Sequence, residues 1–425
     1  MPFGAALACA VALFGAALAP ATASAATCPA GPFTGALSAA LSSRYPGKGF
    51  SATVVDLRDG CTYDLAPGRR MTTASVFKVE VLAGVLLKAQ QEGRDLNAWE
   101  AARVRPMIAE SADGPTNQLF SYLGGVAGFA RLHRTFGLSE TSTPSGTWGL
   151  TTTTARDETK LLRQVLLGGG PLGAAARQRA RVEMTSVVPA QRWGITEGAP
   201  AGWVVAQKNG FAPSRERGWR LNSVGQVGTG WLVATFTDGW PSEAAGIEGN
   251  RFLNRAISTS LARVPVGPFA TATAFVDRQF ADILRRAPRY DERLAWAGVT
   301  QSSNAPAAVV AWLIGLSGRE DAARFAMAGN DQGAAVADEA WLDAYYRMVL
   351  RRPPDAGARA WLGRRRTDVV RGVSQSAEYR ALVGPDVNGI LVGQLLLGRP
   401  WGSQPDRLAF IGAVLGSAEY RERVT

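Results

Sequence analysis

Two residues near the start of an apolar segment have the types and the spacing for nucleophilic chemistry. Ser75 and Lys78 lie in the run MTTASVFKVEVLAGVLLKAQ, residues 71–90. We expect this run to form one buried helix, capped by Thr72 or Thr73, because apolar residues cover almost its whole surface. The amine then lies one turn from the hydroxyl, where a desolvated lysine can deprotonate a serine. A chance Ser-x-x-Lys is the alternative interpretation of this spacing alone.

A metal centre and a serine-histidine-aspartate triad lack the residues that they need. Cys9 lies in a leader that we expect to be removed, which leaves two cysteines and one histidine, His133. These are too few donors for a thiolate or imidazole metal site. His133 lies in ARLHRTFGL, which is typical of an ordinary amphipathic helix rather than of a triad. We therefore expect no metal and no cofactor, with serine and lysine moving the protons.

The first 26 residues have the form of a secretory signal. They are small and apolar and end in Ala23-Ser24-Ala25, a small-x-small cleavage site. Lys and Arg are missing from their start, so an uncleaved membrane anchor is the alternative. Cys28 would suggest a lipoprotein, but the residues before it make a poor lipobox. We expect export, cleavage, and a secreted or envelope-associated protein.

Removal of the leader would leave Cys28 and Cys61, the even number expected of an exported domain. A disulfide between them would tie the N-terminus to the second strand of a hairpin. A loop of that length contributes roughly 3 kcal/mol to stability. Free buried thiols are the alternative.

Length and composition indicate at least two globular domains. The chain has 425 residues, of which 46% are apolar and 19% charged. Its net charge of +11 comes mostly from arginine and suits anionic surroundings such as a cell envelope. The longest basic run, Arg364–Arg366, has no aromatic pattern beside it, so we expect no nucleic-acid partner.

Several helices and strands must position Ser75 and Lys78. Periodicity and turn residues predict helices at 33–44, 101–107, 155–166 and 250–261, and strands at 51–55, 61–65, 202–206, 222–227 and 231–237. Asp59-Gly60 predicts the hairpin turn, and Thr154 with Asp157 predicts a capping box. Polar residues and Gly-Pro at 108–117 separate two helical segments. The sequence indicates an α+β domain.

Three motifs in this order resemble the serine β-lactamase and penicillin-binding protein superfamily, most closely class A β-lactamases. They are Ser75-Val76-Phe77-Lys78, Ser111-Ala112-Asp113 and Lys208-Asn209-Gly210. The resemblance covers about residues 30–263 and implies an antiparallel sheet flanked by helices. It also implies that Ser75 forms an acyl-enzyme, with Lys78 as its proton acceptor.

The same resemblance implies the roles of the remaining site residues. Ser111 would pass a proton to the leaving nitrogen, and Lys208 would hold a substrate carboxylate. Backbone N–H groups of Ser75 and Phe211 would hold the oxyanion. Further substrate contacts would come from Asp113, Asn117, Asn209 and Gly210. Arg220 is either an extra carboxylate ligand or a solvated strand-end arginine.

Three departures from the family pattern bear on turnover. Asp113 stands where the family has an asparagine, and Asn209 where it has Thr or Ser. The segment 137–154 looks too short to carry the family's deacylating glutamate. We expect Glu140, its only acid, to be a surface residue, and we assign Asp157 and Glu158 to the helix start. Acylation followed by slow deacylation is therefore expected.

Beyond a Pro-Gly-Thr linker at 264–273, residues 274–425 contain no lysine and show imperfect helical repeats. ILRRAP at 283–288 returns as VLRRPP at 349–354 and, more weakly, as LLGRP at 396–400; SAEYR occurs at 376–380 and 417–421. This repeated pattern resembles the helical repeat domains of exported bacterial surface proteins, and the resemblance implies an envelope partner.

Two functions follow from these observations. The first is an exported serine hydrolase acting on β-lactams, D-alanyl peptides of the peptidoglycan type or a related amide or ester. The second is a degenerate enzyme that binds envelope ligands and uses the helical repeats for attachment.

Overall fold

The sheet at the centre of the N-terminal part is antiparallel throughout. The computed structural model describes residues 28–144, 146–303, 305–320 and 335–425. Five strands hydrogen-bond in the order β2-β1-β7-β6-β5. Their bounds are β1 Gly49–Asp56, β2 Thr62–Leu65, β5 Val205–Ala212, β6 Trp219–Val227 and β7 Trp231–Trp240. The predicted α+β class, with an antiparallel sheet flanked by helices, is confirmed.

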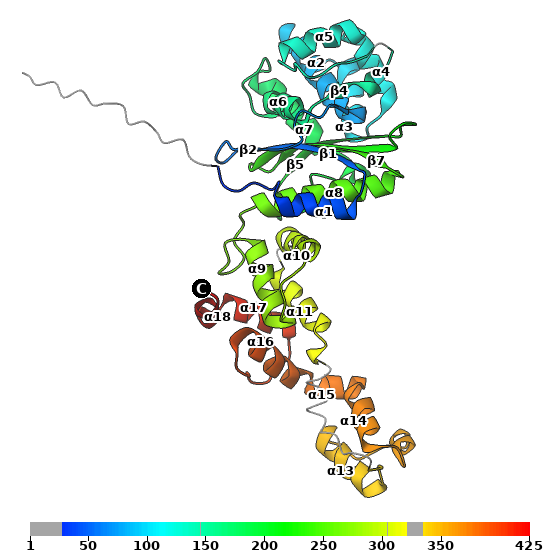
Figure 1. The fold of residues 1–425 in the computed structure, drawn as a ribbon, viewed down its shortest axis with the longest axis vertical. Coiled ribbons are helices and arrows are strands. Elements are labelled where there is room, and N and C mark those ends of the chain that lie inside the picture. Colours follow the sequence, from blue (N-terminus) through cyan, green and yellow to red (C-terminus); the bar gives the residue numbers. More distant parts are fainter. Residues whose placement is uncertain (1–27, 145, 304, 321–334) are drawn as a thin grey trace, which may run out of the picture.

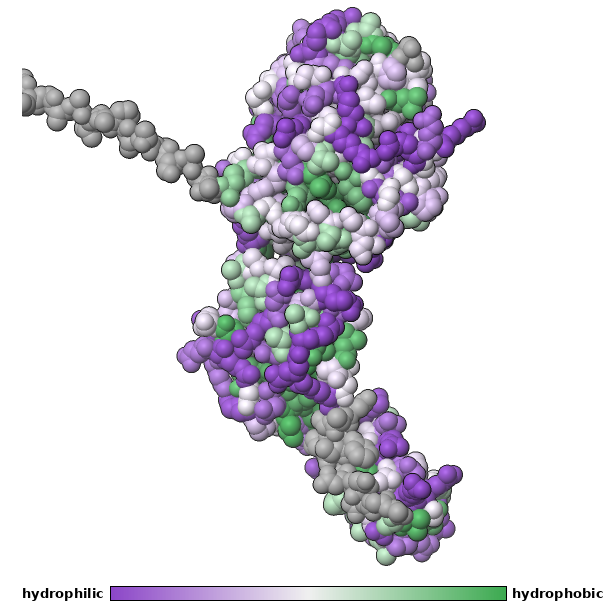
Figure 2. All heavy atoms as spheres, viewed as in Figure 1, coloured by the Kyte–Doolittle hydropathy of each residue, from purple (hydrophilic) through white to green (hydrophobic). Residues whose placement is uncertain are grey.

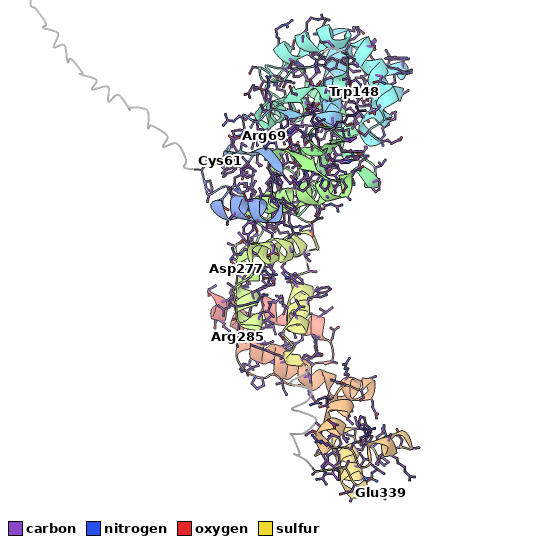
Figure 3. The ribbon with its side chains drawn as sticks, turned by 45° about the vertical axis from the view of Figure 1, so that its right-hand side comes forward. Cys61, Arg69, Trp148, Asp277, Arg285 and Glu339 are labelled. Atoms are coloured by element: carbon purple, nitrogen blue, oxygen red, sulfur yellow. A yellow bond between two sulfur atoms is a disulfide. The ribbon has the colours of Figure 1, made fainter. Side chains whose placement is uncertain are left out.

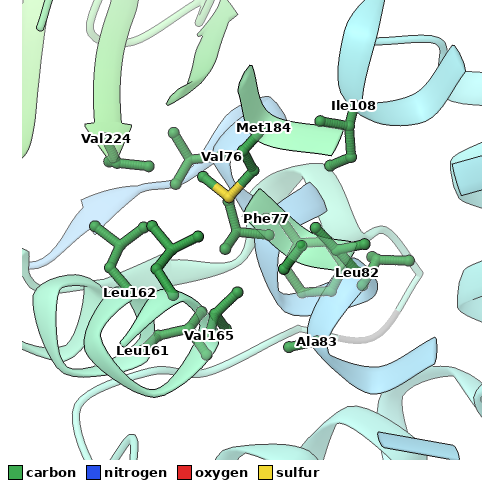
Figure 4. Packing of buried hydrophobic residues seen from close by; sticks show 14 of the residues in the cluster. Val76, Phe77, Leu82, Ala83, Ile108, Leu161, Leu162, Val165, Met184 and Val224 are labelled. Atoms are coloured by element: carbon green, nitrogen blue, oxygen red, sulfur yellow. The ribbon is translucent and has the colours of Figure 1, made fainter. Parts of the chain in front are cut away.

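Helices cover both faces of this sheet (Figure 1). One face carries α1 (Gly35–Arg44) and α8 (Glu243–Leu261). The other carries α2 Lys78–Gln91, α3 Ala98–Ala109, α4 Asp113–Tyr122, α5 Gly125–Thr135, α6 Ala155–Leu166 and α7 Ala174–Thr185. The largest apolar cluster fills the space between this second layer and the sheet (Figure 4). Helix α2 is buried along most of its length, so it is the central helix of the layer.

The expected single helix over 71–90 is wrong at its start. Met71–Thr72 forms strand β3, which pairs with β4 (Thr152–Thr153), and Ala74–Phe77 forms the 3-10 turn η1. The α-helix begins only at Lys78. Thr73 does not cap it, because its hydroxyl and its N–H both donate to the Thr151 carbonyl.

The expected strand at 202–206 is also displaced. Strand β5 runs from Val205 to Ala212, so the third motif lies inside the strand and not after it. The prediction stopped at the first polar residues, but Lys208 and Asn209 are buried within the sheet. Helix α8 likewise begins earlier than expected, because Ser242 accepts a hydrogen bond from the Ala245 N–H and so caps the helix.

The predicted disulfide between Cys28 and Cys61 is confirmed, with a Cα–Cα distance of 5.7 Å (Figure 3). It closes a loop with a sequence separation of 33. Reducing it is expected to lower the free energy of unfolding by about 3 kcal/mol, because the unfolded chain gains freedom. Urea unfolding with and without a reductant measures this difference. The control is the Cys61→Ser variant, whose stability the reductant should leave unchanged.

The C-terminal part is helical and extends away from the sheet (Figure 1). Its elements are α9 Ala272–Gln279, η4 Phe280–Leu284, α10 Tyr290–Ser303, α11 Pro306–Leu316, α13 Glu339–Val349, η5 Gly357–Trp361, α14 Arg366–Ser374, α15 Ala377–Val387, η6 Asn388–Val392, α16 Gly393–Leu397, α17 Arg407–Gly416 and α18 Ala418–Val424. Two apolar clusters lie within it, and Figure 2 shows apolar patches among its polar surface residues. None of the helices in the described ranges is long and apolar enough to cross a membrane.

Matched positions of the C-terminal sequence repeats share local geometry. Arg285, Arg351 and Gly398 all have left-handed backbone conformations, with φ of 57°, 56° and 76°. The arginine after each forms two hydrogen bonds to one glutamate; the pairs are Arg286–Glu292, Arg352–Glu378 and Arg399–Glu419. The repeated sequence therefore corresponds to a repeated turn and ion pair. The domain boundaries stay a prediction.

Candidate active site

Ser75 lies at an exposed point of an otherwise buried turn. Its neighbours Val76 and Phe77 are fully buried in the main apolar cluster, which fixes the turn from beneath (Figure 4). Ala74 has a positive φ of 48°, an uncommon conformation for a residue with a side chain. Ser75 itself is partly exposed. The turn therefore presents one hydroxyl to solvent while its backbone is held by the core.

Lys78 is buried and its amine contacts the Ser75 hydroxyl. The distance from Nζ to Ser75 Oγ is 3.0 Å. Nζ also lies 2.6 Å from the Ser111 carbonyl oxygen, 3.2 Å from Ser111 Oγ and 2.6 Å from Asp113 Oδ1. Among the described residues, Lys78 is the one side chain that hydrogen-bonds the Ser75 hydroxyl. The first two motifs therefore meet at a single amine.

Lys208 completes the cluster from strand β5. Its Nζ lies 2.9 Å from Ser111 Oγ, so the Ser111 hydroxyl lies between two lysine amines. Ser111 has a φ of 63°, which turns the chain sharply between α3 and α4 and directs this residue at both lysines. The structure thus brings Ser75, Lys78, Ser111 and Lys208 together from three motifs.

Burial lowers the pKa of both lysines. For Lys78, removal from water is the largest cause, and the hydrogen bond and charge of Asp113 act in the opposite direction. For Lys208, burial holds the pKa well below its usual value, and the charge of Lys78 lowers it further. The neutral amine, which a general base must be, therefore forms at lower pH at both positions than it would in water.

Gly210 lets strand β5 approach Ser75 closely. A Cβ at this position would lie 2.6 Å from the Thr73 carbonyl oxygen and 3.0 Å from the Ser75 nitrogen. Phe211, one residue further along the strand, is partly exposed. The Asn209 amide donates to the Gln191 and Trp193 carbonyls, so its donors are occupied within the protein. Its expected contact with substrate stays a prediction.

Trp148 is a site residue that the sequence did not reveal. Its ring lies 5.2 Å from Lys78 Nζ and stacks against Phe77, and its Nε1 donates to Asn117 Oδ1 at 2.7 Å. Asn117 is exposed, and its side chain serves to hold this ring. The available signal was that Trp148 is the single aromatic residue of the segment 137–154.

The acids near the shortened segment serve local structure. Glu140 is half-buried and not a free surface residue, because its carboxylate accepts from the Thr154 hydroxyl. Thr154 caps α6 through the Asp157 N–H, as expected. The Asp157 carboxylate does not complete a capping box, because it accepts from the Glu140 N–H and the Thr141 hydroxyl.

Glu158 and Arg220 are charged residues that the fold removes wholly or partly from water. Glu158 is buried and its Oε1 has no hydrogen-bond partner within the described chain. Arg220 lies on β6 opposite Ala212, is half-buried and has no ion pair among the described residues. Burial lowers the pKa of its guanidinium. His133 is also buried, with Nε2 2.7 Å from Glu80 Oε2.

Replacing Glu158 with glutamine is expected to change how stability depends on pH. Burial, with the charges of Glu80 and Asp157, raises the pKa of Glu158 well above 4.5. The folded state then holds a proton that the unfolded state loses, so wild-type stability falls as pH rises from about 4.5. Between pH 5 and pH 8, the free energy of unfolding of the variant should rise relative to that of wild type by at least about 1 kcal/mol. Urea unfolding at pH 5 and at pH 8 measures this change. The control is Glu110→Gln, which changes an exposed glutamate and should show no such rise.

Parts of the chain are similar to known proteins. No family model matches the chain. Proteins of Mycobacterium tuberculosis and Mycobacterium bovis, each named "Putative lipoprotein LppW", are 30% identical over 190 residues. That match covers 43% of this chain and 60% of the relatives, less than two thirds of their length.

Solved structures also align with about half of the chain. An ancestral class A β-lactamase aligns with a TM-score of 0.46 and 20% identity, over 52% of this chain and 98% of its own. A β-lactamase from Xanthomonas campestris aligns with a TM-score of 0.46 and 19% identity, over 52% of this chain and 95% of its own. The structure titled PBP-A aligns with a TM-score of 0.47 and 18% identity, over 53% of this chain and 94% of its own.

Proposed function

We propose that this protein is an exported serine hydrolase of the β-lactamase and penicillin-binding protein type. The observation that carries the proposal is the 3.0 Å contact between Lys78 Nζ and Ser75 Oγ, made by a buried amine with a lowered pKa. Its substrates would be amide or ester carbonyls of the β-lactam or D-alanyl peptide class. An envelope location accords with the name of the lipoprotein relatives.

The reaction begins when neutral Lys78 takes the Ser75 proton and Ser75 Oγ bonds to the carbonyl carbon. The oxyanion is held by the N–H groups of Ser75 and Phe211. Ser111, hydrogen-bonded to both lysines, passes a proton to the leaving group as the scissile bond breaks. The product of these steps is an acyl-enzyme.

Deacylation is slow in this proposal. Glu140 bonds to Thr154, and Asp157 bonds to the Glu140 N–H and to Thr141, so both carboxylates are already engaged. An activated water at Ser75 would depend on Lys78 alone within the described chain. The acyl-enzyme should therefore accumulate.

A fluorescent penicillin followed by intact-protein mass tests the proposal. Wild type should gain the mass of one probe and keep it after excess probe is removed. Ser75→Ala should gain nothing, whereas Ser121→Ala, which changes an exposed serine on α4, should label like wild type. Labelling that survives in Ser75→Ala would place the nucleophile elsewhere.

A second candidate is a degenerate enzyme that only binds envelope ligands. The observation in its favour is the 2.6 Å ion pair between Lys78 and Asp113, which opposes loss of the lysine proton. Absence of labelling by every acylating probe would support this second function.

A further inference from the structure

The Lys78 amine has more hydrogen-bond acceptors than protons. An ammonium group has three N–H donors, and four oxygens lie within 3.2 Å of Nζ. The two shortest contacts, both 2.6 Å, go to the Ser111 carbonyl and to Asp113 Oδ1. The contact with Ser75 therefore competes with Asp113 for the same amine.

Asp113 combines this inner contact with an outward-facing charge. Its side chain is 71% exposed, although the lysine that it pairs with is fully buried. It is the first residue of α4, so its carboxylate lies at the positive end of the helix dipole. One oxygen, Oδ1, contacts Lys78, and within the described structure Oδ2 has no hydrogen-bond partner. A negative charge is thus open to solvent directly beside the nucleophile.

An aromatic ring, as well as Asp113, lies beside the Lys78 amine. The Trp148 ring presents its π-electron face 5.2 Å from Lys78 Nζ, and such a face attracts positive charge. Lys208 lies on the other side of Ser111 and is buried, so it does not cover the Asp113 carboxylate. The exposed Asp113 carboxylate is therefore free to pair with a substrate cation.

We propose that Asp113 selects acyl donors that carry an ammonium group close to the scissile carbonyl. The inference rests on the proposed acyl-enzyme chemistry and names its substrate class. The substrate ammonium pairs with Asp113 and weakens the hold of that carboxylate on Lys78. Lys78 then releases one proton to solvent and accepts the Ser75 proton as the acyl bond forms. Donors without the ammonium group leave the Lys78–Asp113 pair intact and acylate more slowly.

Two penicillins that differ by a single amino group test this inference. Ampicillin carries an α-amino group on the acyl side chain, and benzylpenicillin lacks it. At about pH 6, where the α-amino group is protonated, wild type should be acylated about tenfold faster by ampicillin. Asp113→Asn should reduce this ratio to about one, whereas Glu110→Gln, which removes an exposed charge from the end of α3, should keep it.

The possible outcomes separate this inference from the proposed function. Equal rates with both penicillins in wild type would overturn the role of Asp113 and leave the acyl-enzyme intact. Labelling by neither penicillin would overturn the proposed function itself. If Asp113→Asn does not fold, the wild-type ratio is measured against pH instead. It should fall toward one above about pH 8, where the substrate amine is neutral.

Discussion

Replacing Lys78 with alanine is expected to lower the rate of acylation by about 10²- to 10⁴-fold, the usual contribution of a general base. The amine lies 3.0 Å from Ser75 Oγ and is the one side chain within the described chain that hydrogen-bonds it. Lys78→Arg should fail similarly, because a guanidinium does not deprotonate in proteins. Rapid-quench mass spectrometry with a penicillin measures the rate under single-turnover conditions.

The matched control for this experiment is Lys88→Ala on the same helix. Lys88 is partly exposed and pairs with Glu92 on the helix surface, far along α2 from Ser75. Its loss should leave acylation unchanged. If Lys78→Ala acylated at the wild-type rate, the proton acceptor would have to be another group, and the proposed role of Lys78 would be wrong.

The same base predicts how acylation depends on pH. The pKa of Lys78 is lowered from 10.5 by burial, and its neutral form is the reactive one in the proposed mechanism. The acylation rate of wild type should therefore rise with pH and level off below pH 10.5. Asp113 opposes the effect of burial, so Asp113→Asn should move this rise to lower pH.

The motif spacing was sufficient to predict the contact between Ser75 and Lys78. Ser75 and Lys78 lie close together because any helical turn places residues three apart on one face. Ser111 and Lys208 are far apart in the sequence, and their approach depends on the sheet and on the positive φ of Ser111. The family resemblance predicted that approach, and periodicity alone did not.

Other features of the site depend on contacts that local sequence does not encode. The Thr73 hydroxyl was expected to cap a helix, but it bonds to Thr151, which is 78 residues away. Strand β5 was predicted too short because a buried Lys208 departs from the usual apolar pattern of a strand interior. Trp148 reaches Lys78 through the fold of a loop without regular periodicity. Tertiary contacts outweighed local preference at each position.

Replacing Gly210 with alanine is expected to lower acylation by about 100-fold and the free energy of unfolding by about 1–3 kcal/mol. The new Cβ would lie 2.6 Å from the Thr73 carbonyl oxygen, 2.7 Å from the Val76 nitrogen and 3.0 Å from the Ser75 nitrogen. All three are backbone atoms, which cannot rotate away as a side chain would. The strand must therefore move from the nucleophile, and the Phe211 N–H moves with it.

Gly68→Ala is the matched control, because a Cβ at Gly68 meets no atom within 4 Å. Single-turnover labelling and urea unfolding are measured for both variants and for wild type. A stability loss in Gly210→Ala without a loss of rate would mean that β5 supports the fold and takes no part in catalysis. Loss of both is the expected result, since the same backbone contact that packs the strand also holds the Phe211 N–H, the proposed oxyanion donor, beside Ser75.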